Sequence, residues 1–127
     1  MSDSSNIVLA CRLVAAFTAG DEPAIEQLIH PAHREHAAPG SPRGPDGVRE
    51  ALRRLRAELP SMQITTEDII ASGDRVVMRI RVCDDALAHE DEQIHIWRVA
   101  EGLLAEHWMV PGRRALGRNL ARRASGS

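Results

Sequence analysis

The spacing of apolar residues predicts helices in the first part of the chain. Residues 5–19 carry apolar side chains at helical spacing, and Gly20 follows as a stop. Asp21 can cap a short second helix, because its side-chain oxygen can accept a hydrogen bond from the first turn. His30-Pro31 ends that helix, since the residue before a proline avoids the α region.

The next segment, residues 31–46, is rich in proline and glycine. It is predicted as a loop, with a short extended piece at residues 34–38. A third helix is expected from Pro45 to about Leu59, because proline is favoured at the first helical position and Pro60 stops the helix.

Past the third helix the pattern changes from helical spacing to alternation, which predicts β-strands. Residues 62–72 and 75–83 are expected as two strands joined by a turn at Gly73-Asp74, and residues 84–92 as a charged connection. Two more strands follow. Three helices before four strands predict an α+β domain with the helices packed on one face of an antiparallel sheet.

The last two strands form the most informative stretch, residues 93–109, with a tight turn at residues 100–102. His95, Trp97 and Val99 alternate onto one face of the first strand. Both tryptophans of the protein, and two of its six histidines, occur in this stretch. We expect this hairpin to form one wall of any site that the protein has.

The composition is that of one globular domain. The chain has 127 residues, of which 43% are hydrophobic and 27% are charged. Aromatic residues are scarce: the chain has one phenylalanine (Phe17), two tryptophans (Trp97 and Trp108) and no tyrosine. A core of aliphatic residues and methionine is therefore expected.

The cysteines and the hydropathy of the chain indicate the cellular compartment in which the protein is expected. Cys11 and Cys83 lie far apart in apolar contexts, which predicts buried free thiols in a reducing compartment. The sequence shows no signal-peptide pattern and no apolar run long enough to cross a bilayer. We expect a cytoplasmic protein without membrane contact.

Charge is distributed unevenly along the chain, although the net charge is only −2. All acidic residues lie at or before Glu106, whereas residues 111–127 form a basic tail without any acid. The arginines of this tail are Arg113, Arg114, Arg118, Arg122 and Arg123. We expect a domain at residues 1–110, followed by a tail that is disordered or folds back on the acidic body. Nucleic-acid binding is not expected, because no aromatic residues interleave with the arginines.

Three histidines, His30, His33 and His36, recur at a spacing of three residues. In a proline-rich loop this spacing does not place the side chains on one helical face, and no cysteine partner is near. The sequence therefore predicts neither a metal site nor a cofactor.

The order of several short motifs resembles SnoaL-like polyketide cyclases. The matching segments, which span roughly residues 7–110, are Leu28-Ile29-His30-Pro31, Glu35-His36, Gly47-Val48-Arg49-Glu50-Ala51-Leu52, Leu59-Pro60, Ser72-Gly73-Asp74-Arg75-Val76, Val99-Ala100-Glu101-Gly102 and Ala105-Glu106-His107-Trp108. The resemblance implies the nuclear-transport-factor-two-like fold, a strongly curved sheet wrapped around a long helix to form a cone with a central apolar pocket. It also implies a homodimer formed through the outer face of the sheet.

The resemblance assigns roles to particular positions. In these cyclases an acid just after the His-Trp pair moves a proton next to a carbonyl, and a histidine on the preceding strand assists. The histidine corresponds to His95. The acid corresponds to Met109, which cannot transfer a proton. The chain is also shorter than its relatives between Cys83 and Gln93.

Two histidines are candidate catalytic residues. His95 can serve as a general base, because the unperturbed pKa of histidine is near neutral. The alternative is that His95 is a core or interface histidine with satisfied hydrogen bonds. His36 matches the histidine that the family carries before the Pro/Gly loop. The predicted substrate-pocket residues are Phe17, Met78, Trp97 and Met109. His107 is expected on the outer face of the sheet.

Three functions are compatible with this pattern. The first is a cyclase or isomerase that transfers a proton on a small apolar carbonyl compound. The second is a non-catalytic small-molecule binder that has kept the pocket and lost the acid at position 109. The third is an interaction module whose basic tail contacts a partner.

Overall fold

The computed structural model describes residues 2–112, so the basic tail from residue 113 onward lies outside the described residues. The helices are α1 (Asp3–Ala19), α2 (Glu22–Leu28) and α3 (Pro45–Glu58), and the strands are β1 (Ile29–Glu35), β2 (Gln63–Ser72), β3 (Arg75–Asp84), β4 (His89–Ala100) and β5 (Leu103–Val110). The predicted α+β class is confirmed, and so are the three helices.

The strands form one sheet in the order β1-β5-β4-β3-β2. Strands β2 to β5 pair antiparallel, as predicted, but β1 pairs parallel with β5 and makes the sheet mixed. The extended piece expected at residues 34–38 is in fact β1, which begins directly after α2. Pro31 lies within it, and an edge strand tolerates a residue that cannot donate a backbone hydrogen bond.

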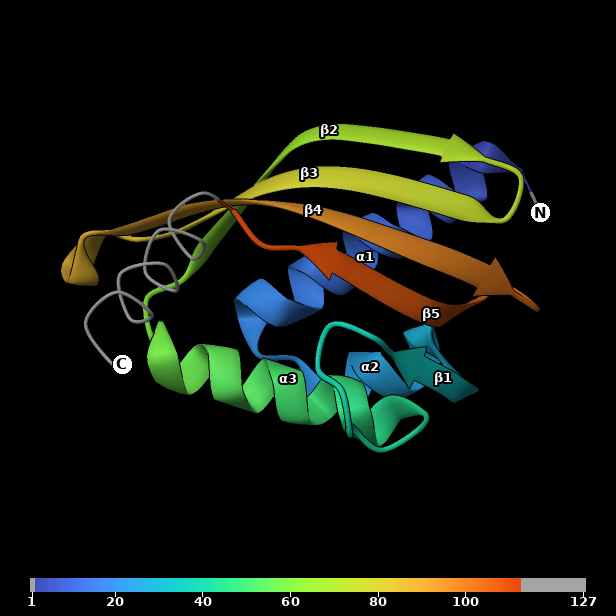
Figure 1. Ribbon diagram of the computed structural model, residues 1–127, viewed down its shortest axis with the longest axis horizontal. Helices are drawn as coiled ribbons and strands as arrows, with labels where there is room; N and C mark the ends of the chain where they lie inside the picture. Colours follow the sequence, from blue (N-terminus) through green and yellow to red (C-terminus); the bar gives the residue numbers. More distant parts are fainter. Residues whose placement is uncertain (1, 113–127) are drawn as a thin grey trace, which may run out of the picture.

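The helices lie on one side of the curved sheet, and the sheet does not close on itself (Figure 1). Helix α1 crosses behind the strands, and α3 lies near the β1 edge of the sheet, where it contacts β1 and α2. No helix within residues 2–112 is long and apolar enough to cross a membrane.

The core lies between the inner face of the sheet and the helices. The alternation predicted for β3 is confirmed, because Val76, Met78, Ile80 and Val82 are all buried. The other large apolar residues of this core are Leu9, Leu13, Ile25, Leu28, Ile29, Val48, Leu52, Leu59, Met62, Trp97, Val99 and Leu104. The prediction of a buried thiol at Cys11 is wrong, since this side of α1 faces solvent.

The charged segment 84–92 is not a loop, which corrects the sequence prediction. Strand β3 continues to Asp84, a 3₁₀ turn covers Asp85–Leu87, and β4 already begins at His89. The fully buried carboxylate of Asp84 stabilises this corner, because it accepts hydrogen bonds from the backbone N–H groups of Ser61 at 2.9 Å and Leu87 at 3.3 Å.

The outer face of the sheet combines ion pairs with an apolar row. Arg79 pairs with Asp68 of β2 and with Glu92, which belongs to the segment that the sequence analysis assigned to a connection.

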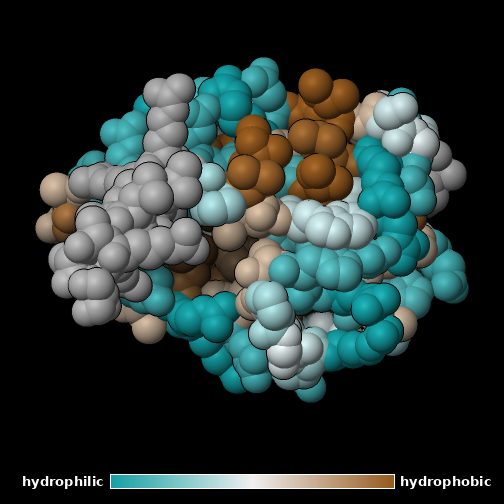
Figure 2. Space-filling view, in the orientation of Figure 1, coloured by the Kyte–Doolittle hydropathy of each residue, from teal (hydrophilic) through white to brown (hydrophobic). Residues whose placement is uncertain are grey.

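Ile70, Val77 and Ile96 face one another across β2, β3 and β4, and Figure 2 shows an apolar patch over these strands.

Replacing Leu28, which is 1% exposed, by alanine should lower the free energy of unfolding by about 3 kcal/mol, because a buried leucine leaves a cavity. The matched control is Leu87→Ala, at a leucine that is 55% exposed, and its effect should stay within about 0.5 kcal/mol. Urea denaturation of both variants measures the difference. Equal losses would contradict the described core.

Candidate functional site

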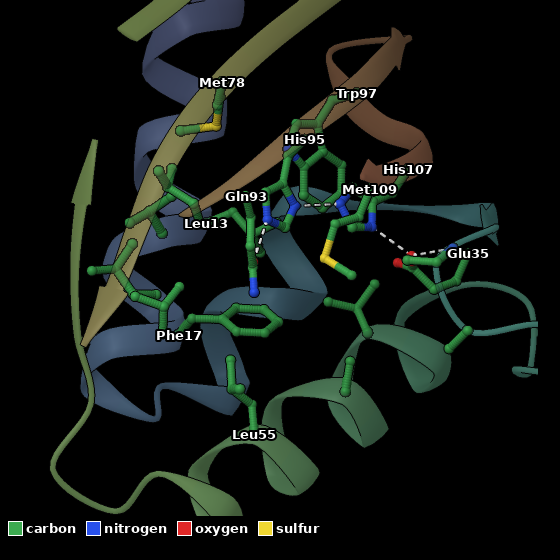
Figure 3. A pocket seen from close by; sticks show the side chains of 18 of the residues that line it. Leu13, Phe17, Glu35, Leu55, Met78, Gln93, His95, Trp97, His107 and Met109 are labelled. Atoms are coloured by element: carbon green, nitrogen blue, oxygen red, sulfur yellow. Dashed lines mark hydrogen bonds and ion pairs between the residues drawn. The ribbon is translucent and has the colours of Figure 1, made fainter. Parts of the chain in front are cut away.

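A cavity of about 230 Å³ lies between the inner face of the sheet and helices α1 and α3 (Figure 3). Most of its wall is apolar: Leu13, Val14, Phe17, Ala37, Ala38, Val48, Ala51, Leu55, Ile64, Met78, Ile80, Val82, Trp97 and Met109. Arg54 and Glu58 of α3 also line it, and both are exposed. The cavity therefore opens beside α3, where Figure 2 shows a hollow.

The structure brings most of the predicted site residues together. Phe17, Met78, Trp97 and Met109 all line this one cavity, and so does His95, which faces Met109 across the β4–β5 pair. Phe17 comes from α1 and the others come from the sheet.

His36 does not line the cavity. Its ring stacks on Trp108 at 4.9 Å between centroids, and its Nε2 lies 2.7 Å from Glu106 Oε2. Arg75 lies over the same tryptophan, 5.0 Å from the ring centroid. His36 therefore belongs to a cluster on the other side of the sheet.

The prediction that His107 lies on the outer face is wrong, because its side chain is buried and lines the cavity. It lies two residues before Met109 on β5, and residues two apart on a strand share a face. The spacing within the sequence already contained this signal. Glu35 was not a predicted site residue, and only the parallel pairing of β1 with β5 brings it to the cavity.

Four side chains from three strands form one hydrogen-bonded chain along the cavity wall (Figure 3). Glu35 Oε2 lies 2.5 Å from His107 Nδ1, and His107 Nε2 lies 2.7 Å from His95 Nδ1. His95 Nε2 lies 2.9 Å from Gln93 Oε1. We call Glu35, His107, His95 and Gln93 the relay. Both ring nitrogens of His95 are thus hydrogen-bonded.

Further groups hold each end of the relay. At one end, His33 Nδ1 donates to the carbonyl oxygen of Leu104 at 2.9 Å, and His33 Nε2 lies 3.3 Å from Glu35 Oε1. At the other end, Gln93 Nε2 donates to Asp91 Oδ2 at 3.2 Å. Between the ends, the ring of Trp97 stacks on His107 with 3.9 Å between centroids, which fixes the plane of that imidazole.

The surroundings shift the pKa values of two relay residues. Burial acts to raise the pKa of Glu35, but hydrogen bonds from His107 and His33 outweigh it and lower this pKa to about 2. Burial, helped by repulsion from His107 and opposed by attraction to Glu35, lowers the pKa of His95 to about 3. At neutral pH, Glu35 is therefore a carboxylate and His95 is neutral.

Comparison with known proteins identifies the family. The sequence matches the SnoaL-like domain over residues 10–107. The chain belongs to the SnoaL-like family. No curated protein matches the sequence.

Solved structures agree with this SnoaL-like assignment. TsrD from Streptomyces laurentii is 25% identical, and its TM-score is 0.80 with coverage of 93% of this chain and 96% of that one. A loop truncation variant of IdmH, a protein from Streptomyces antibioticus, is 26% identical, with a TM-score of 0.76 and coverage of 91% and 98%. A SnoaL-like polyketide cyclase from Agrobacterium tumefaciens is 13% identical, with a TM-score of 0.74 and coverage of 94% and 99%, and therefore shows the fold alone.

Within this SnoaL-like site, the relay can donate or accept a proton at the cavity wall. The carboxylate that is connected to His95 is Glu35, since position 109 is a methionine. Residues 2–112 contain no group of three or more histidine, cysteine or acidic side chains that could hold a metal ion.

His95 should make the stability of the protein depend on pH. Its pKa is about 3 when folded and near 6.5 when unfolded, so between these values the unfolded state binds the extra proton. His95 therefore contributes a loss of stability on acidification, of about 2 kcal/mol between pH 7 and pH 5. In the His95→Gln variant the decline over this range should be smaller by about that amount, as measured by urea denaturation at each pH. An equal decline in both proteins would contradict the assignment.

Proposed function

We propose that this SnoaL-like protein is a cyclase or isomerase that transfers a proton next to a carbonyl group of a small, mostly apolar compound. One observation carries the proposal: the relay is a hydrogen-bonded chain of polar side chains in a mostly apolar cavity wall. An apolar cavity with a few convergent polar groups is the usual form of a small-molecule site.

His95 is the proposed base. Of the two histidines to which the sequence pointed, His95 lines the cavity and His36 does not. Trp97 and Phe17 supply flat apolar surfaces on which a planar substrate can pack. Proton transfer by a positioned side chain contributes about 10²- to 10⁴-fold to a rate, so the loss of His95 is measurable.

A second candidate function is non-catalytic binding of a small apolar molecule. Met109 favours it, because a thioether stands where the resemblance places the acid of the cyclases. The same cavity supports both functions, and only a chemical readout separates them.

The proposed partner of the protein is a second copy of the chain, bound through the outer face of the sheet. The apolar row in the centre of this face supports it, because Ile70 is 64% exposed and Val77 is 36% exposed. Exposed apolar side chains in one row offer a self-complementary surface for a two-fold contact.

Ligand binding and chemistry can be tested in one series. Aromatic polyketides, steroids and terpenoid epoxides are screened for a rise in melting temperature, and each stabilising carbonyl compound is then incubated in D₂O. We expect deuterium to enter the position next to the carbonyl, and His95→Gln to slow this exchange by about 100-fold or more while binding persists.

The matched control for this series is His89→Gln, at a histidine on the same strand that does not line the cavity. It should exchange at the rate of the unchanged protein. Stabilisation without exchange would favour the non-catalytic binder, and no stabilisation by any compound would contradict both functions.

Placing a charge in the apolar row should dissociate the dimer. Val77→Glu is expected to halve the mass measured by light scattering, because an unpaired carboxylate is disfavoured in an apolar contact. The control Val8→Glu adds the same charge at a valine of α1 that is 56% exposed, and should leave the mass unchanged. A monomer in the unsubstituted protein would contradict the proposed partner.

A further inference from the structure

We infer that Glu35 and His107 are positioning residues that store the transferable proton for His95, in place of the acid that the resemblance assigns to position 109. The inference rests on the proposed function and gives roles to two residues to which the resemblance assigns none. It follows from the contacts along the relay, from the burial of the Glu35 carboxylate, and from the number of protons that the hydrogen bonds of the relay require.

The carboxylate of Glu35 lies in the interior of the protein. Its side chain is 4% exposed, and that of His107 is 9% exposed. A charge at such a position is unfavourable unless it is paired and hydrogen-bonded. Here Glu35 Oε2 contacts His107 and also accepts the backbone N–H of Ala37 at 3.3 Å, while Oε1 faces His33. The pocket is thus built to hold a negative charge at the far end of the relay.

Asp91 determines the direction of the hydrogen bonds. It is buried, and as a carboxylate it can only accept, so Gln93 must turn its N–H₂ toward Asp91 and its oxygen toward His95. His95 Nε2 therefore donates to Gln93, which leaves His95 Nδ1 as an acceptor. In the hydrogen bond between His95 Nδ1 and His107 Nε2, the proton therefore lies on His107 Nε2.

One further proton completes the relay. With Nε2 of His107 already a donor, the 2.5 Å contact between its Nδ1 and Glu35 Oε2 requires a proton as well. The pKa of Glu35 is about 2, which leaves that proton on the imidazole. We call this state of the relay, an imidazolium beside a carboxylate with a net charge of zero, the loaded state.

Release of one proton converts the relay into its base form. His107 Nδ1 still donates to Glu35, His95 Nδ1 now donates to His107 Nε2, and His95 Nε2 carries a free lone pair. That lone pair repels the oxygen of Gln93, so the amide turns aside and exposes His95 to a ligand.

The reaction then proceeds without a further reactant. A C–H bond next to the substrate carbonyl breaks, its electron pair forms the enolate, and the proton bonds to His95 Nε2. The proton on His95 Nδ1 passes to His107 Nε2, which regenerates the loaded state. His95 later returns a proton to another carbon or to the oxygen of the product, which completes the isomerisation or ring closure.

Other charged groups face this region without entering the relay. His33 lies behind Glu35, Asp91 lies behind Gln93, and Arg54 and Glu58 line the cavity from α3. Helix α1 contributes only apolar side chains to the cavity lining. Glu35 is therefore the carboxylate in direct contact with the histidine pair.

The first test is NMR of the imidazole nitrogens of the ligand-free protein across pH. We expect His95 and His107 to titrate together, since protons in a coupled chain belong to the whole chain. Glu35→Gln should lower their common midpoint by one pH unit or more, and Glu35→Asp should restore most of it. The control Glu101→Gln removes an exposed carboxylate that contacts His30, and should change nothing.

The second test follows the pH profile of deuterium exchange with a substrate. Glu35→Gln should slow exchange at least 10-fold and move the acidic limb of the profile to lower pH. Adding Met109→Asp to this variant should restore the rate, because residue 109 faces His95 across the strand pair. Met109→Asn, which lacks the charge, should not restore it.

Separate titration of His95 and His107 in the unsubstituted protein would overturn the inference, even if no Glu35 variant folds. A profile unchanged by Glu35→Gln would overturn it as well. The NMR test needs no substrate, so coupled titration without any reactive compound would support the relay and contradict the proposed function.

Discussion

The contact between Glu35 and His107 is the interaction on which the arrangement of this site depends. It joins the edge strand β1 to β5, and it exists because these two strands run parallel and place Glu35 opposite His107 in the register. The same contact places a carboxylate under the sheet without leaving it unpaired. The pairing of the buried Glu35 and the hydrogen bonds that orient His107 and His95 depend on it.

This constraint explains how the site differs from the pattern of its family. Proton transfer in an apolar pocket requires a group that can balance a positive charge on histidine, since such a charge is poorly solvated there. Where the resemblance places the acid of the cyclases, this chain has Met109 opposite His95. The carboxylate that can balance the charge comes from β1 instead, one imidazole further away. The apolar character of the cavity and the polarity of the relay are thus parts of one arrangement.

Much of the fold could be predicted from the sequence, because its signals are local. Alternation in β3 and β4 indicated which faces are buried, and the proline and glycine positions marked the ends of the helices. The cavity residues Met78 and Trp97 followed from that alternation, and Phe17 from the helical spacing of α1, each together with the family resemblance. The predictions that failed concern contacts between segments far apart in the sequence. The pairing of β1 with β5 joins segments about 70 residues apart, and the spacing of residues 29–35 does not indicate a parallel edge strand. Glu35 was overlooked for that reason, whereas His107 was misplaced although its spacing from Met109 indicates the shared face.

The proposed relay requires that His107 carries two protons and joins a carboxylate to His95. Neutron diffraction from a deuterium-exchanged crystal at neutral pH can locate these protons. We expect deuterium on both nitrogens of His107, deuterium on the Nε2 of His95 facing Gln93, and none on Glu35. A His107 ring with a single deuterium, or rotated so that it no longer joins Glu35 to His95, would rule out the relay.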